Sequence, residues 1–128
     1  MCVRNGLLLY LIILTVSLHG ICFAQNSPSV EDRAYEYNRA GMMDMSMARF
    51  EEAIEEFRKA AALLPDYQIR GRSLVYTPIF MTAWAYEKIG RQNEACDQYR
   101  KFLESSPPEV VEESKAQHAR EVLDQCRH

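Results

Sequence analysis

Residues 50–65 read FEEAIEEFRKAAALLP, and this stretch decides the fold. Its apolar side chains recur at steps of three and four residues, and charged side chains fall between them. A helix with this spacing has one apolar stripe that packs against a neighbour and one face that water solvates. We therefore expect an amphipathic helix that ends at Pro65. Its stripe comprises Phe50, Ala53, Ile54, Phe57, Ala60 and Ala61.

Helical signals continue on both sides of this stretch. Ser29 with an acid three residues later resembles a capping box and predicts a helix start. Thr77-Pro78 predicts another start, and Gly90 is suited to a left-handed helix end. No segment alternates between polar and apolar residues, so no strand is expected. Besides the helix at residues 50–64, we expect helices at about 30–47, 78–89, 93–104 and 109–125.

One spacing of small, aromatic and proline residues occurs twice. In each copy an alanine precedes an aromatic residue by four positions, and a proline follows that aromatic residue by eight. The pattern resembles the tetratricopeptide repeat, a helix-turn-helix unit of about 34 residues. The resemblance covers roughly residues 34–107, with extra length in 67–76. The residues are Ala53, Phe57 and Pro65 in the first copy and Ala95, Tyr99 and Pro107 in the second.

The resemblance implies an all-α fold, an α-solenoid of two tetratricopeptide-like helical hairpins plus a C-terminal capping helix. The repeats would span about 34–66 and 76–108, and the capping helix about 109–126. Gly41 and Ala83 are small enough to let paired helices approach closely, whereas Ala48 stands where the family has a turn glycine. Because such arrays usually need about three repeats, we expect a staple or a partner to assist this one.

The N-terminal residues have the composition of a secretory signal. Arg4 precedes the apolar run LLLYLIILTV, and small residues stand three and one positions before a cut after Ala24. An uncleaved anchor and a lipid-modified Cys22 are the alternatives. The apolar stretch is short for an anchor, and Ile21 occupies a position where lipoprotein signals have a small residue. The expected division is a signal peptide at 1–24, a polar leader at 25–29 and a helical domain at 30–128.

Composition excludes several classes of function. The 128 residues include 15 Lys or Arg and 18 Asp or Glu, so the chain lacks the basic excess that nucleic-acid binding needs. No uninterrupted apolar run of membrane-spanning length occurs, so no span is expected after signal cleavage. An exported protein would be periplasmic or secreted.

Cleavage would leave Cys96 and Cys126 in a compartment that permits disulfides. A last helix that starts at Glu109 would carry Cys126 about 10 Å too far along its axis. An extended loop that lasts until Ser114 would bring the two sulfurs into register. The sequence is therefore compatible with two alternatives, a disulfide between Cys96 and Cys126 or two half-buried free thiols.

The resemblance also implies a binding surface. In this family the first helix of each unit lines a groove that receives an extended peptide or a partner helix. The groove would be rich in aromatic and methionine side chains, which suit apolar partners. Alternatively, two of its members, Phe80 and Trp84, pack under residues 67–76. The residues carried onto the groove are Tyr35, Asn38, Met42, Met45, Phe80, Trp84 and Glu87.

Metal and catalytic sites receive little support. The cluster Met42, Met43, Met45 and Met47 offers thioethers for Cu(I), but helical spacing does not make the four converge. His118 and His128 have no recognisable sequence pairing with a nucleophile or an acid, and neither a phosphate loop nor zinc spacing is present. We therefore expect no enzyme and no cofactor.

The favoured function is an exported adaptor or scaffold that binds a protein or peptide. A Cu(I)-handling protein and a structural subunit of an envelope assembly or oligomer are the alternatives.

Overall fold

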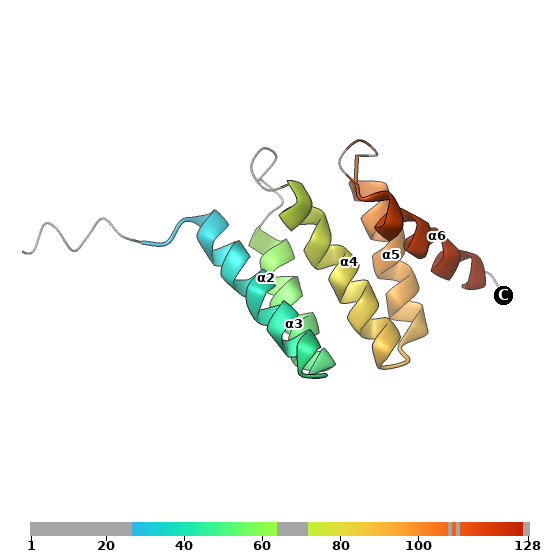
Figure 1. The fold of residues 1–128 in the computed structure, drawn as a ribbon, viewed down its shortest axis with the longest axis horizontal. Coiled ribbons are helices and arrows are strands. Elements are labelled where there is room, and N and C mark those ends of the chain that lie inside the picture. Colours follow the sequence, from blue (N-terminus) through green and yellow to red (C-terminus); the bar gives the residue numbers. More distant parts are fainter. Residues whose placement is uncertain (1–26, 64–71, 108, 110, 127–128) are drawn as a thin grey trace, which may run out of the picture.

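The computed structural model describes residues 27–63, 72–107, 109 and 111–126. Five helices follow one another in this part of the chain, and it contains no strand, which confirms the all-α prediction (Figure 1). The predicted signal peptide lies outside the described residues, as do residues 64–71. The helices are α2 (Val30–Ser46), α3 (Phe50–Leu63), α4 (Arg72–Lys88), α5 (Gln92–Ser105) and α6 (Glu113–Gln125).

Each helix packs against the next one along the chain, so the helices form a row from α2 to α6 (Figure 1). Tight turns join α2 to α3 and α4 to α5. The helices α2, α4 and α6 form the nearer layer in Figure 1, with α3 and α5 behind them. This is the predicted arrangement of two hairpins and a capping helix.

The start of α2 is the predicted capping box. The Ser29 hydroxyl accepts the backbone N–H of Asp32 at 3.0 Å, and the Asp32 carboxylate accepts the backbone N–H of Ser29 at 3.1 Å. These two backbone N–H groups lie at the start of the helix, where no carbonyl of the preceding turn is available to accept from them. The polar leader therefore gives way to helix at Val30.

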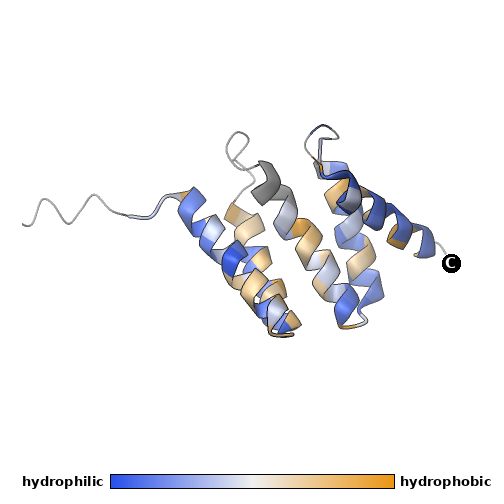
Figure 2. Ribbon diagram, in the orientation of Figure 1, coloured by the Kyte–Doolittle hydropathy of each residue, from blue (hydrophilic) through white to orange (hydrophobic). Residues whose placement is uncertain are grey.

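The first hairpin is closed by a small residue against a large one. A Cβ atom added to Gly41 would lie 2.7 Å from Cε1 of Phe57, a ring that is fully buried. Ala53 and Ala60 flank this ring on α3 and are also buried. Figure 2 shows apolar residues along α3 and α4, from which the core continues into the aromatic residues of α5.

The two hairpin turns have the same backbone geometry. Gly90 has φ +73°, which confirms the predicted left-handed helix end, and Ala48 takes the corresponding position at φ +57°. In each turn two backbone N–H groups donate to carbonyls of the last helical turn, a Schellman arrangement. The bonds are Gly90 to Glu87 (3.1 Å) and Arg91 to Tyr86 (2.9 Å), and Ala48 to Met45 (3.1 Å) and Arg49 to Asp44 (2.9 Å).

Two predicted helix starts are wrong. Helix α4 begins at Arg72 rather than at Pro78, which lies inside it. A proline within a helix removes only one backbone donor, and α4 is held by α3 on one side and α5 on the other. The Pro78 side chain is fully buried, and Thr82 Oγ1 donates to the Pro78 carbonyl at 2.8 Å.

The second wrong start is that of α6, which begins at Glu113 and not at Glu109. Two consecutive prolines, at 107 and 108, supply no backbone N–H, and the described residues Glu109, Val111 and Glu112 are not helical. The late start shortens the capping helix by about one turn.

Candidate functional site

A pocket lies where α4 meets α6. Its volume is about 270 Å³, and it is open to the surface. We call it the α4–α6 pocket. It is lined by residues of both helices and by the N-cap residue of α6. These residues are Phe80, Trp84, Glu112, Ser114, Lys115 and His118.

Phe80 forms the floor of this pocket. Its ring is 7% exposed and makes edge contacts with the rings of Phe102, Tyr99 and His118, at centroid distances of 5.3, 5.5 and 6.0 Å. These contacts are with α5 and α6. The alternative that Phe80 packs under residues 67–76 falls mainly on residues outside the described ones.

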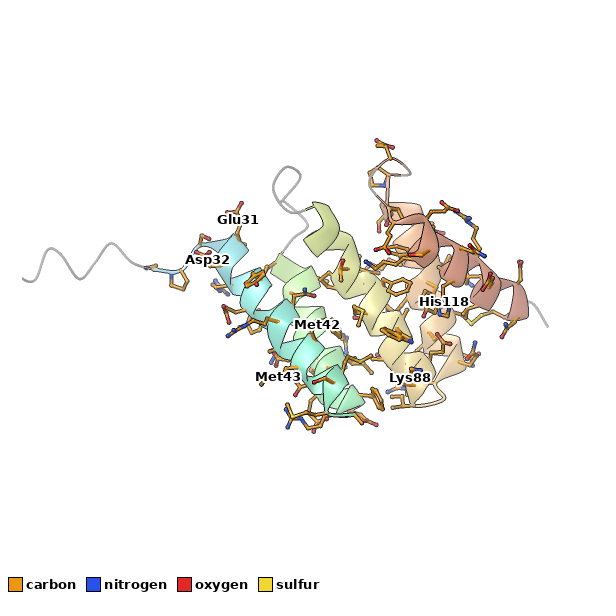
Figure 3. All side chains as sticks on the ribbon, viewed as in Figure 1. Glu31, Asp32, Met42, Met43, Lys88 and His118 are labelled. Atoms are coloured by element: carbon orange, nitrogen blue, oxygen red, sulfur yellow. A yellow bond between two sulfur atoms is a disulfide. The ribbon has the colours of Figure 1, made fainter. Side chains whose placement is uncertain are left out.

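Trp84 forms the wall one helical turn further along α4. It is 36% exposed, and the Lys88 ammonium lies 5.5 Å from its ring centroid. Figure 3 labels Lys88 near the C-terminal end of α4. An indole that is partly exposed beside a buried phenyl ring presents apolar surface that a ligand can cover.

Three polar side chains from three helices meet beside the pocket. The Tyr99 hydroxyl donates to Glu87 Oε2 at 2.8 Å, and His118 Nε2 lies 3.1 Å from both of these oxygens. Because the phenol proton already points at the carboxylate, we assign the histidine proton to Nε2, which donates to both oxygens. Burial, with the bond to Glu87, raises the pKa of Tyr99 well above its ordinary value.

The sequence alone gives no acid partner for His118, so it does not predict this cluster. Glu87 lies 31 residues earlier in the chain and Tyr99 lies 19 residues earlier. No local motif carries such a pairing, because only the packing of α6 beside α4 and α5 creates it. Figure 3 shows His118 on α6, on the side towards α4.

The mouth of the pocket carries an ordered carboxylate. Glu112 Oε1 accepts from Ser114 Oγ at 2.7 Å, and Glu112 Oε2 pairs with Lys115 Nζ at 2.9 Å. These contacts lower the pKa of Glu112 and keep it ionised. The pocket thus combines an aromatic floor and wall with a polar rim.

The predicted groove residues of α2 have different surroundings. Tyr35 and Met42 are 56% and 45% exposed, whereas Met45 is half-buried against the core. Asn38 is half-buried, and none of the described residues donates to its Oδ1 atom. The structure therefore places Tyr35 and Met42 at the surface, and it places Phe80 largely in the core.

The methionine cluster does not form a convergent set. Met42, Met43 and Met47 are exposed, but successive residues point about 100° apart around a helix, and Met45 faces the core. Among the described residues, no group of three or more His, Cys, Asp or Glu side chains is placed to hold a metal ion.

Cys96 and Cys126 form a disulfide, with 6.4 Å between their Cα atoms. The late start of α6 brings Cys126 level with Cys96, which is the extended-loop alternative considered from the sequence. The bond joins α5 to the residue that ends α6.

The described helices include none that is long and apolar enough to cross a membrane. The sequence model of the Tetratricopeptide repeat family matches residues 37–67 and 79–109, so that each match covers most of one hairpin. No curated protein and no solved structure gives a significant match. The chain therefore belongs to the tetratricopeptide repeat family, whose repeats are typically non-catalytic and indicate a protein–protein interaction module.

Proposed function

We propose that this protein is a non-catalytic adaptor or scaffold that binds a peptide or helix of a partner protein. The binding surface is the face over α2, α4 and α6, which we call the groove face. The observation that carries the proposal is the α4–α6 pocket, in which Trp84 stands partly exposed over the buried Phe80 ring.

The chemistry of this face favours an apolar anchor from the partner. Large aromatic side chains gain most when a partner displaces the remaining water from them, and they dominate many interfaces. Tyr35 and Met42 extend the exposed apolar surface onto α2, and a thioether adapts its shape to different neighbours. A segment that crosses from α6 to α2 would contact all of these groups.

The polar rim would fix the orientation of the partner segment. Glu112 and Lys115 already pair with each other, so their free hydrogen-bonding capacity is available without an unpaired charge becoming buried. Backbone groups of an extended segment supply both donors and acceptors for such a rim.

We further propose that the protein is exported, with residues 1–24 removed as a signal peptide. The sequence of this segment supports export, and the Cys96–Cys126 bond suits an oxidising compartment such as a periplasm or the exterior of the cell. N-terminal sequencing of the protein recovered from its native envelope tests the cut after Ala24.

A matched pair of photocrosslinking variants tests the binding face. Lys88 lies beside Trp84 on α4, whereas Lys101 is exposed on α5 on the side away from the core. A photoreactive residue at position 88 is expected to capture one defined partner from the native envelope, and the same residue at 101 is not. Trp84→Ala in the position-88 variant should abolish capture. Equal labelling from both positions would contradict the proposal.

A further inference from the structure

We propose that the Cys96–Cys126 disulfide is a redox switch for the α4–α6 pocket. Reduction of this bond by a dithiol would let α6 separate from α5 and would dismantle the pocket. The inference rests on the proposed function, because it concerns the regulation of the same binding face.

The pocket depends on α6 for most of its lining. Ser114, Lys115 and His118 lie on α6, and Glu112 is its N-cap residue. Only Phe80 and Trp84 come from α4. When α6 leaves, the aromatic floor and wall remain, but the enclosure and the polar rim are lost.

The noncovalent hold on α6 is weaker than that on the other helices. Its buried side chains are Ala116, Ala119 and Val122, and Leu123 packs against the core partly buried; these aliphatic side chains remove only a modest apolar surface from water. Helices α4 and α5 bury several aromatic rings instead. His118, which is itself partly exposed, makes the polar contacts of α6 with Glu87 on α4 and Tyr99 on α5, and its ring packs against Phe80. A helix held in this way opens more readily than the hairpins do.

The disulfide supplements this weak contact at one end of α6. It fixes the residue that follows the helix to Cys96 on α5, so the C-terminal end of α6 stays beside α5 when its side-chain contacts break. Closing the 30-residue loop also restricts the detached state, which favours the docked one.

The two sulfurs differ in their access to a reductant. Cys96 is 5% exposed, whereas Cys126 is half-buried at the C-terminal end of α6. A dithiol thiolate therefore attacks Cys126 Sγ, the S–S bond breaks and Cys96 leaves as the thiolate. The second thiol then attacks the mixed disulfide and releases Cys126. The dithiol becomes a cyclic disulfide, and its two electrons and two protons reduce the protein to two cysteine thiols.

Hydrogen exchange tests this inference in the full chain carrying Cys2→Ser and Cys22→Ser, so that the reagent has a single target. Dithiothreitol is the reductant. We expect amides of α6 to exchange at least roughly tenfold faster after reduction, while those of α2 and α3 change less than about twofold. Acrylamide should also quench the fluorescence of Trp84, the sole tryptophan, more strongly after reduction, because its indole ring becomes more accessible.

The same chain with Cys96→Ser and Cys126→Ser provides the control. It should match the reduced protein without reagent and should not respond to dithiothreitol. Unchanged protection of α6 would overturn the inference, and so would an equal loss of protection in α2 and α3, which would make the bond a staple of the whole fold. No partner is present in the experiment, so failure of the proposed binding function leaves its readout intact.

Discussion

The left-handed residue in each hairpin turn yields a pair of predictions with opposite signs. Ala48 and Gly90 occupy the same position of the same turn, at φ +57° and +73°. An L-residue in this conformation costs about 1–2 kcal/mol because its Cβ approaches the following carbonyl oxygen. Glycine avoids that cost but loses about 0.5–1 kcal/mol more chain entropy on folding. Ala48→Gly should therefore raise the free energy of unfolding by about 1 kcal/mol.

The reverse change at the second turn isolates the backbone term. A Cβ atom added to Gly90 meets no heavy atom within 4 Å, so it introduces no clash with a neighbour. The whole effect of Gly90→Ala then comes from its positive φ. We expect the free energy of unfolding to fall by about 1 kcal/mol.

Urea unfolding followed by far-ultraviolet circular dichroism measures both effects. In thermal scans a change of 1 kcal/mol corresponds to roughly 4–8 °C in Tm for a domain of this size. Ala40→Gly, in the interior of α2, is the matched control and should lose about 1 kcal/mol through helix propensity. The reasoning fails if Ala48→Gly is no more stable than the parent chain, or if Gly90→Ala is neutral.

Three other perturbations follow from the packing, the polar cluster and the helix cap. Gly41→Ala should destabilise the chain by about 1–2 kcal/mol, because the fully buried Phe57 ring must move and the better helix propensity of alanine offsets only part of that cost. An unchanged urea midpoint would show that the contact between Gly41 and Phe57 is not tight. The raised pKa of Tyr99 means that the unfolded chain loses the phenol proton first, so stability should fall as pH rises above the ordinary tyrosine value of 10.0. Tyr99→Phe should flatten that decline in urea titrations between about pH 9 and about pH 11, and an identical slope in both proteins would refute the assignment. Ser29→Ala should cost about 1 kcal/mol and speed amide exchange in the first turn of α2, and equal exchange would show that the capping box contributes nothing.

The fold follows largely from periodicity in the sequence. The apolar stripe around Phe57 and the repeated spacing around Tyr99 predict the two hairpins, since each pattern reflects contacts within one helix pair. Helix starts were less predictable where proline was the signal. Pro78 is compatible with either the first turn or the interior of a helix, and only packing on both sides of α4 decides between them.

The candidate site was predictable only in part. Trp84 could be placed on a groove-lining helix from the family resemblance, and it does line the pocket. The meeting of Glu87 with His118 could not be predicted, because it depends on the start of α6 and on the angle at which that helix packs. Contacts between distant elements leave no periodic trace in a single sequence.

The bond between Cys96 and Cys126 also determines how the molecule responds to tension. Its two cysteines are 30 residues apart in the sequence. Because an extended chain spans at most about 3.6 Å per residue, the bond prevents roughly 100 Å of chain from extending when the two ends are pulled apart. Helices α2, α3 and α4 contain no cysteine, so they lengthen without this restraint. When the oxidised molecule is stretched, the helices on its N-terminal side therefore unfold and extend, whereas the residues between Cys96 and Cys126 do not add to its length.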